Sequence, residues 1–489
     1  MNPDVILVTV FAIVVLVAII LMAQPIWLAL AVSGGLGLLL VSGLGVTVST
    51  IGAAAYASTA SYALVIVPMF ILMGVLASRA GLAVDVFTIA QRFTKWVPGG
   101  LGVATILACG GFSAVTGSTS ATVATIGRIS VEQMTRRGYR ANAAAALVAL
   151  GATVGVLIPP SILMVIFGIL TGLSIGKLLL AGLIPGLITM CFYVGAVIVF
   201  YKRGFFEPRT AKEKALYARY AAALDEALPG QSARPTDLAA ESAVLAGGRA
   251  GMPASGAAIV THEQKLTPRN WMGAGYVALL FVIIMGGMYG GLFTATEAGA
   301  VAAAVAVVIL LIRVLREGVR ATLVALKDSF IDAASVSSMV FALIFGGGIF
   351  AFFLLKTGLP SQIARAVVAA QLPPLLVIIV ALVMLLILGA LMDEISILLI
   401  VIPLLWPVLD QMGVDGIWFG VLAMKATAVG LIAPPVGLNV FVASGVSKHV
   451  SAERIYQAIL PFFIVEVLII AVLIIFPGIS TFLPDLMAR

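Results

Sequence analysis

The sequence predicts an all-α polytopic membrane protein, and three observations support this fold class. Only 10% of the 489 residues are charged and 62% are hydrophobic, whereas a soluble domain carries about 25% charged residues. Many apolar runs approach the length that a helix needs to cross a bilayer about 30 Å thick. Two long apolar segments are interrupted in the middle by a double proline. The alternation of apolar and polar residues that is typical of a membrane β-barrel is missing from these runs.

The charges and the reactive residues exclude several other classes of protein. The formal net charge of +7 comes from Lys and Arg in short loops, a pattern that sets membrane topology, so no nucleic acid partner is expected. Cys109 and Cys191 lie in apolar segments, while His262 and His449 lie far apart in polar ones. These residues form no disulfide, metal-binding or catalytic pattern, so neither an enzyme nor a cofactor is predicted.

The first half of the chain contains two scaffold spans and then a repeat unit. Residues 1–60 hold spans at about 4–23 and 26–43, and the N-terminus lacks the basic region of a cleavable signal peptide. Repeat 1 covers 61–201, with a span at 61–78, an amphipathic helix at 82–97, a hairpin at about 99–134, a broken helix at about 141–172 and a span at 178–201. Each limb of the hairpin is too short to cross the bilayer, so we expect it to be re-entrant. One long helix with polar residues facing its neighbours is the alternative.

The second half begins with a polar loop and ends with a second repeat. Residues 202–269 form a cytoplasmic loop whose part at about 225–262 is rich in Pro, Gly and charge, which predicts a flexible insertion. Residues 270–328 contain further scaffold spans (271–291 and 295–313) and a basic surface helix. Repeat 2 covers 329–489, with a span at about 329–355, an amphipathic segment at 359–371, a hairpin at about 373–412, a broken helix at about 416–446 and a last span at 456–477.

A nearly constant offset relates the two halves. The distance along the chain is 277 residues from Gly81 to Gly358, and it is 275 from Pro159 to Pro434. The chain makes an odd number of membrane crossings between Gly81 and Gly358, so the two repeats must have opposite orientations. The distribution of Lys and Arg agrees, and it places both termini in the periplasm. The full prediction is therefore an inverted-repeat, elevator-type fold with two re-entrant hairpins and two proline-broken helices.

The broken helices indicate where ions and substrate bind. Proline removes a backbone donor and clashes with the preceding turn, so each double proline frees carbonyl groups in the membrane. Such backbone is tolerated only where protein or a watery cavity covers it. Paired interrupted helices in two halves are the best sequence indication of a transporter's binding site. The breaks lie at Pro159-Pro160 and Pro434-Pro435.

Glycine carbonyls and hydroxyl side chains near these breaks supply the oxygen ligands that Na⁺ needs. The first candidate sodium site consists of Gly117, Ser118, Thr119, Ser120, Gly151, Thr153 and Gly155. By repeat logic, the second consists of Asp393, Ser396, Thr427, Gly430 and Gly437. Taken one at a time, these residues are explained equally well by helix packing. Their occurrence as two clusters at matching places favours a function.

Substrate contacts are predicted at the starts of the half-helices that follow the breaks. Helix N-termini carry partial positive charge, which suits a carboxylate. The substrate residues are Ser161, Lys425 and Asn439, together with the prolines that mark the breaks, Pro159 and Pro434. Asp393 and Glu394 are adjacent acids in apolar sequence, and a membrane-buried carboxylate is usually functional or ion-paired. Lys425 is the available partner, or it attracts the anionic substrate. In Thr294-Ala-Thr-Glu297 a helix cap is preferred over a function.

Several of these motifs together resemble the large membrane subunit of tripartite ATP-independent periplasmic (TRAP) transporters. They are Gly117–Thr122, Gly151–Ser161, Thr294–Ala298, Leu391–Glu394 and Gly430–Asn439. The resemblance covers nearly the whole chain. It implies a sodium-coupled elevator that imports organic acids such as C4-dicarboxylates or sialic acids across the bacterial inner membrane. It also implies two partners, a small four-helix membrane subunit and a periplasmic substrate-binding protein.

Three other functions are alternatives to this one. An intramembrane enzyme needs a nucleophile and base, or metal ligands, and the sequence offers neither. A stand-alone sodium/carboxylate symporter of a related fold needs no binding protein and is the principal alternative. A passive channel is the third. The sequence leaves open which organic acid is carried, the number of coupled sodium ions and the oligomeric state.

Overall fold

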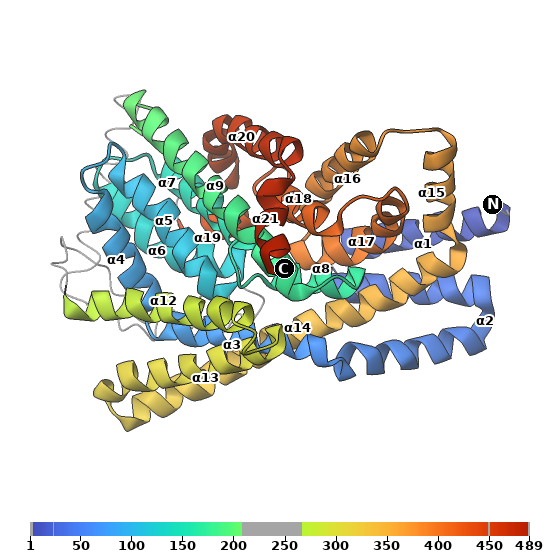
Figure 1. Ribbon diagram of the computed structural model, residues 1–489, viewed down its shortest axis with the longest axis horizontal. Coiled ribbons are helices and arrows are strands. Elements are labelled where there is room, and N and C mark those ends of the chain that lie inside the picture. The colour runs from blue at the N-terminus through green and yellow to red at the C-terminus, as the bar shows by residue number, and fades with distance from the viewer. Residues whose placement is uncertain (1–2, 23, 208–266, 448–449, 488–489) are drawn as a thin grey trace.

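The computed structural model describes residues 3–22, 24–207, 267–447 and 450–487, and in these ranges the chain forms helices and turns without strands (Figure 1). The insertion predicted at about 225–262 lies outside the described residues. By length and composition, eight of the described helices are suited to cross a membrane. The all-α polytopic fold predicted from the sequence is confirmed.

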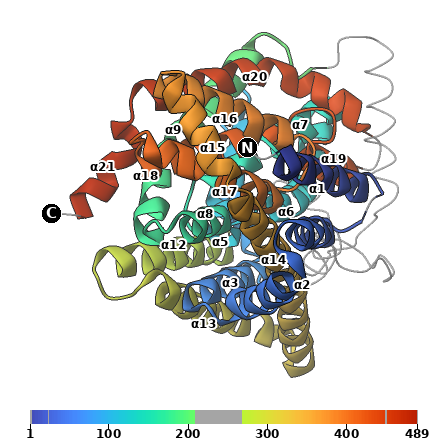
Figure 2. The same ribbon diagram turned by 90° about the vertical axis from the view of Figure 1, so that its right-hand side faces the viewer.

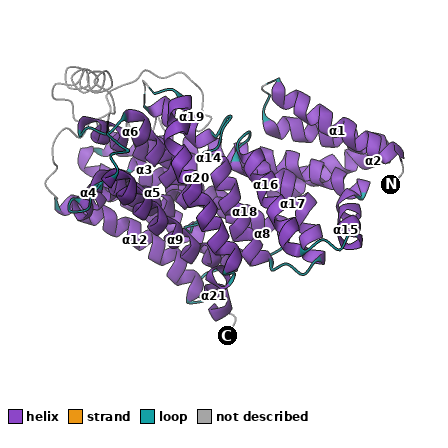
Figure 3. Cartoon of the chain, turned by 90° about the horizontal axis from the view of Figure 1, so that it is seen from above, coloured by secondary structure: helices purple, strands orange, loops and turns teal. Residues whose placement is uncertain are grey.

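Two N-terminal helices pack along one long helix at one end of the molecule. These are α1 (Pro3–Leu21) and α2 (Ile26–Ala60), beside α14 (Val319–Thr357) (Figure 3). A methyl group on Gly34 would come within 2.7 Å of the Phe350 Cα, and one on Gly37 within 2.5 Å of the Phe353 ring. These glycines therefore let α2 and α14 approach closely. Helix α2 also contains a break at Gly43, which has a left-handed φ of 78°.

Helix α14 differs from the sequence prediction of a basic surface helix followed by a separate span at about 329–355. It runs for 39 residues without interruption, and at 1.5 Å per residue it is roughly 60 Å long. Charged residues near the junction lower the local hydropathy, and the two acidic ones, Asp328 and Asp332, face a basic residue of another helix in the structure. Arg79 at the end of α3 (Ile66–Arg79), only 3% exposed, binds Asp332 and lies 3.5 Å from Asp328. The acidic residues of the charged stretch are therefore neutralised within one continuous helix.

Two further helices, α12 (Pro268–Tyr289) and α13 (Ala295–Val314), fall in the segment that the sequence predicts to be scaffold. Helix α13 lies along α3, where Gly299 faces Phe70. Thr294 and Glu297 form a reciprocal capping box at the start of α13, which confirms the helix cap preferred from the sequence. Figure 2 shows α2, α3 and α13 in a layer on one side of the molecule, with the helices of repeat 2 on the other.

The two repeats contain matching series of helices. Repeat 1 has α4 (Leu82–Thr94), α5 (Gly100–Thr116), α6 (Thr119–Arg136), α7 (Ala141–Ala152), the short 3-10 helix η2 (Thr153–Val156), α8 (Ile162–Thr171) and α9 (Ile175–Lys202). Repeat 2 has α15 (Leu359–Ala369), α16 (Pro374–Gly389), α17 (Glu394–Gln411), α18 (Gly416–Gly430), α19 (Leu438–Val446) and α20 (Ala452–Ile475), followed by α21 (Gly478–Met487). Helices α6 and α17 begin and end 275 residues apart, the offset found in the sequence. Both double prolines have a cis peptide bond.

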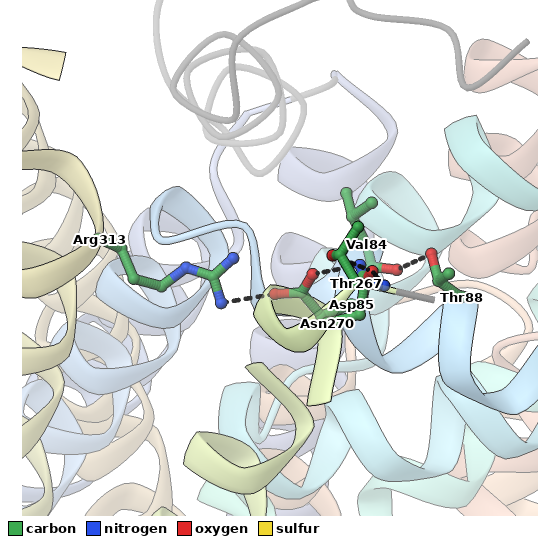
Figure 4. Close-up of polar contacts among 6 residues, drawn as sticks. All are labelled: Val84, Asp85, Thr88, Thr267, Asn270 and Arg313. Atoms are coloured by element: carbon green, nitrogen blue, oxygen red, sulfur yellow. Dashed lines mark hydrogen bonds and ion pairs between the residues drawn. The ribbon is translucent and has the colours of Figure 1, made fainter. Parts of the chain in front are cut away.

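Helix α4 joins repeat 1 to the scaffold through a buried polar cluster (Figure 4). Its Asp85 lies 2.5 Å from Arg313 of α13 and accepts a hydrogen bond of 2.9 Å from Asn270 of α12. Burial raises the pKa of Asp85, and the nearby Arg313 guanidinium opposes this shift. Glycines with left-handed φ angles, Gly81 and Gly99, bound this helix on both sides. Helix α4 is thus tied to α12 and α13 between two left-handed turns.

Candidate functional site

The two hairpin tips are capped by residues 275 positions apart, Ser118 and Asp393. The Ser118 side chain accepts a hydrogen bond from the Ala121 amide at the start of α6. The Asp393 carboxylate accepts hydrogen bonds from the Ile395 and Ser396 amides and from the Ser396 hydroxyl. Asp393 and Ser396, both predicted sodium ligands, therefore serve first to cap α17.

The first tip is also shaped by a glycine. Gly117 adopts a left-handed φ of 60°, which non-glycine residues rarely adopt. A methyl group there would lie 2.8 Å from the Pro160 carbonyl oxygen. The tip of hairpin 1 therefore touches the first helix break directly, as the sequence hypothesis required. Ser161, predicted to contact substrate, is fully buried and caps α8 by accepting from the Met164 amide.

Both tips and the second broken helix meet at one cluster of oxygens. The Thr119 Oγ1 lies 3.1 Å from the Glu394 Oε2 and 3.1 Å from the Asn439 Oδ1. Thr119 has one hydroxyl proton, so it can donate to only one of these two acceptors at a time. Three oxygens thus share one proton, an arrangement that a cation or a hydrogen-bond donor would complete.

This cluster combines residues that the sequence had placed in different groups. Thr119 was assigned to the first sodium site and Asn439 to the substrate site, while Glu394 was noted only as an acid beside Asp393. The constant offset was the signal that could have joined them, because Thr119 and Glu394 are 275 positions apart. The Asn439 side chain is fully buried, and its Nδ2 has no hydrogen-bond partner among the described residues.

A second cluster, of hydroxyl groups, lies behind the first tip. The Thr122 Oγ1 is 3.1 Å from both the Ser113 and the Thr116 hydroxyls, and it donates to the Ser118 carbonyl over 2.9 Å. Gly155 of the first break abuts this cluster, since a methyl group there would lie 2.3 Å from the Ser113 Cβ. We call Ser113, Thr116 and Thr122 the hydroxyl cluster.

The sequence predicted some of the residues at the hydroxyl cluster and missed others. Gly117, Ser118 and Gly155 were predicted and do gather at the hydroxyl cluster, but the three hydroxyl residues were not proposed as ligands. Ser113 and Thr116 are one helical turn apart, and this spacing could have indicated a shared face. Ser120 lies further along α6 with a partly exposed side chain.

Two other residues of the first predicted sodium set face different neighbours. Gly151 packs on α5, where a methyl group would be 3.1 Å from the Cys109 Cβ, so its role is helix packing. The Thr153 hydroxyl lies 2.6 Å from the Leu150 carbonyl and 2.9 Å from the Tyr193 hydroxyl. The structure therefore divides the seven predicted residues among several environments.

The second predicted sodium set is divided as well. A methyl group on Gly430 would lie 2.6 Å from the Gly389 Cα, so these glycines allow backbone contact between α18 and the second hairpin. The Gly437 amide donates to the Ala390 carbonyl over 3.0 Å. Thr427 is fully buried, and its hydroxyl has no partner among the described residues. Along the chain, Pro434 comes soon after Gly430, just as Pro159 comes soon after η2 in repeat 1.

The environment of Lys425 differs from both sequence expectations. Its ammonium is fully buried and lies 2.6 Å from the Glu466 Oε2 of α20. The pairing with Asp393 or Glu394 that the sequence suggested is therefore wrong. The charge of Lys425 is already neutralised by Glu466, so it is not presented to an anionic substrate. The sequence could not reveal this partner, because Glu466 comes from a helix without any recognised motif.

A cavity of about 130 Å³ separates the tips from the scaffold. Gly117, Ser118 and Glu394 line it from the tips, and Ser78 and Asp332 line it from α3 and α14. Among the described residues, no group of three or more His, Cys, Asp or Glu side chains gathers around a common point.

Comparison with known proteins assigns this geometry to a family. A family model described as the tripartite ATP-independent periplasmic transporter, DctM component, matches residues 13–479. The chain belongs to this TRAP transporter family. Membership makes it a transporter permease rather than an enzyme, and a multi-pass protein of the inner membrane. It also implies a three-component system with a small membrane subunit and a periplasmic binding protein.

Two relatives and one solved structure illustrate the match. The chain is 30% identical over 442 residues to the C4-dicarboxylate TRAP transporter large permease protein DctM of Vibrio cholerae, covering 87% of this chain and 86% of that protein. It is 29% identical over 479 residues to the ectoine TRAP transporter large permease protein TeaC of Halomonas elongata, covering 97% and 98%. It resembles the Alcanivorax borkumensis YdaH transporter with a TM-score of 0.54 and 14% identity over 90% of each chain, which supports the fold alone.

Proposed function

We propose that this TRAP permease is the membrane part of a sodium-coupled, binding-protein-dependent importer of organic acids that works by an elevator mechanism. The observation that carries the proposal is the meeting of both hairpin tips at Thr119, Glu394 and Asn439. This meeting point lies beside a cavity that separates the tips from the scaffold. A substrate held there would be carried when the repeats move past the scaffold.

Sodium would bind at the hydroxyl cluster behind the first tip. Na⁺ is a hard cation, and hydroxyl and carbonyl oxygens supply its ligands without adding negative charge. The candidate ligands are Ser113, Thr116, Thr122 and the Ser118 carbonyl, with the broken segment at Gly155 closing the other side. Thr427, whose buried hydroxyl has no partner among the described residues, is the corresponding candidate near the second break.

Coupling would follow from the position of Thr119 next to this cluster. The Ser118 carbonyl would contact the ion, and the following residue, Thr119, bonds to Glu394 and Asn439. Sodium binding would therefore order the first tip and, through Thr119, arrange the groups that face the substrate. The orphan Nδ2 of Asn439 would then donate to a substrate carboxylate. Two of the relatives are named as permeases for C4-dicarboxylates and for ectoine, so these are the first compounds to test.

The moving and stationary parts follow the packing of the helices. The hairpins and broken helices of both repeats would form the transport domain. Helices α1, α2, α12 and α13, with α3 and α14, would form the scaffold that contacts the small membrane subunit. Both chain termini would lie in the periplasm. A periplasmic binding protein would deliver the organic acid to the tips.

Uptake into proteoliposomes that contain the permease and its small subunit tests this proposal. Radiolabelled organic acid is presented with the binding protein, under an inward gradient of either NaCl or KCl. We expect uptake only with the sodium gradient and only with the binding protein. Equal uptake with potassium would refute sodium coupling. Full uptake without the binding protein would instead support a stand-alone sodium/carboxylate symporter.

A further inference from the structure

A buried ion pair inside the repeats takes no part in the function proposed above. The Lys425 ammonium of α18 and the Glu466 carboxylate of α20 are 2.6 Å apart, with side-chain exposures of 0% and 1%. Removing two such charges from water costs several kcal/mol per ion, in rough terms, and apolar residues of similar volume often stabilise a protein equally well. Stability alone therefore does not account for the pair.

Tyr193 connects this pair to the first broken helix. Its hydroxyl donates to the Glu466 carboxylate and accepts a hydrogen bond of 3.1 Å from Lys425. The same hydroxyl lies 2.9 Å from the Thr153 Oγ1. Because the single proton of Tyr193 is used for Glu466, Thr153 must be the donor in this contact. Its one hydroxyl proton is shared between the Tyr193 oxygen and the Leu150 carbonyl 2.6 Å away. The network thus runs from α18 and α20 of repeat 2, through α9, to η2 of repeat 1.

The segment that this network holds is also a wall of the proposed sodium site. Thr153 begins η2 and Gly155 lies two residues later in the same four-residue turn. Gly155 is in close contact with Ser113 of the hydroxyl cluster. One side of the turn is therefore tied to Tyr193, while the other side touches the candidate ligands. A displacement at Thr153 would be passed to Gly155 and Ser113, because close-packed interiors transmit strain.

We propose that Tyr193, held by Lys425 and Glu466, is a positioning residue that fixes the η2 turn and thereby sets the affinity of the first sodium site. The inference rests on the sodium site of the proposed function. In this proposal Lys425 acts by holding Tyr193 in place and does not bind the substrate. The proposal also gives a role to a buried charged network that spans both repeats, because the network makes the sodium site of repeat 1 depend on helices of repeat 2.

Sodium-dependent thermal stability of the purified full-length permease tests the inference without transport. Unfolding temperature is measured in NaCl titrations at constant ionic strength with KCl. A ligand that binds only the folded state stabilises it by RT ln(1 + [Na⁺]/Kd), and the fitted Kd is the sodium concentration that half-saturates the site. In Tyr193→Phe we expect the half-saturating sodium concentration to rise about tenfold or more, and the unfolding temperature in KCl to change little. Thr153→Val should give a similar shift. The double variant should be no worse than either single one, because both break the same link.

A matched control is Tyr139→Phe, which removes another buried tyrosine hydroxyl, one that bonds the Gly102 backbone away from this network. It should leave the sodium titration unchanged. Lys425→Met with Glu466→Leu is the second test, in case the single variant is poorly folded, and it should fold yet bind sodium weakly.

The outcomes separate this inference from the function on which it rests. If the wild-type protein shows no stabilisation specific to sodium, the proposed sodium site is wrong and the inference falls with it. If the wild-type protein responds but Tyr193→Phe and the double-apolar variant keep its half-saturating concentration, the site stands and the positioning role is refuted. A lower unfolding temperature in KCl with unchanged sodium affinity would likewise assign the network a purely structural role.

Discussion

Alanine at position 155 would drive a methyl group into the proposed sodium site. The added Cβ would lie 2.3 Å from the Ser113 Cβ and 2.4 Å from its Oγ, distances that real side chains do not adopt. Either the η2 turn or α5 must therefore move. Overpacking of this kind typically costs about 1–3 kcal/mol of stability. If about 1.4 kcal/mol of that strain is relieved by displacing a ligand, sodium affinity falls tenfold.

The assay is again the sodium-dependent unfolding temperature, with sodium-driven uptake as the second measurement. We expect Gly155→Ala to unfold at a lower temperature and to need at least tenfold more sodium to half-saturate its site. Adding Ser113→Gly removes both atoms of the clash, because the two close contacts are side-chain atoms of Ser113. This double variant should recover stability in KCl but not sodium affinity, since the hydroxyl ligand is gone.

A control on the same helix separates this effect from the general cost of a new methyl group. A Cβ at Gly111 of α5 would lie 3.4 Å from the Val86 Cγ1, an ordinary packing distance. Gly111→Ala should therefore leave the sodium titration unaltered. The reasoning is refuted if Gly155→Ala keeps wild-type stability and sodium affinity, or if the double variant recovers both properties together.

Two further predictions concern the tips and the scaffold. Glu394→Gln keeps the size of the side chain but removes its charge beside Thr119, and we expect it to fold normally but to lose at least tenfold of its uptake in proteoliposomes. The control variant Glu453→Gln, on the exposed start of α20, should transport normally. Equal uptake by the two variants would exclude a role for the Glu394 charge. Asp85→Asn leaves Arg313 buried without its ion pair and should lower the free energy of unfolding by about 3–5 kcal/mol, as measured by chemical denaturation. Asp328→Asn, at a carboxylate that is 42% exposed, should cost about 0–1 kcal/mol. A similar loss in both variants would contradict the inference that Asp85 ties α4 to α12 and α13.

Local chain chemistry determined much of the architecture from the sequence. The double prolines at 159–160 and 434–435 must interrupt helices wherever they occur, because proline lacks an amide donor and clashes with the preceding turn. Gly117 marks a tip because a left-handed turn needs a residue without a side chain. The offset between such landmarks predicted two matching halves, and in the structure α6 and α17 begin and end 275 residues apart. These features depend on neighbours along the chain, so the sequence contains them.

The tertiary structure decided which polar groups face one another. Lys425 is paired with Glu466, and Asp393 is occupied as a helix cap, because helices distant in sequence bring these partners within reach only after packing. The continuity of α14 through its charged stretch is also evident only in the structure, where Arg79 of another helix binds the two acidic residues, Asp328 and Asp332. The hydroxyl cluster likewise forms only when the first break is pressed against α5 at Ser113. Hydropathy and turn chemistry act locally, whereas the pairing of buried charges and hydroxyls requires the assembled fold.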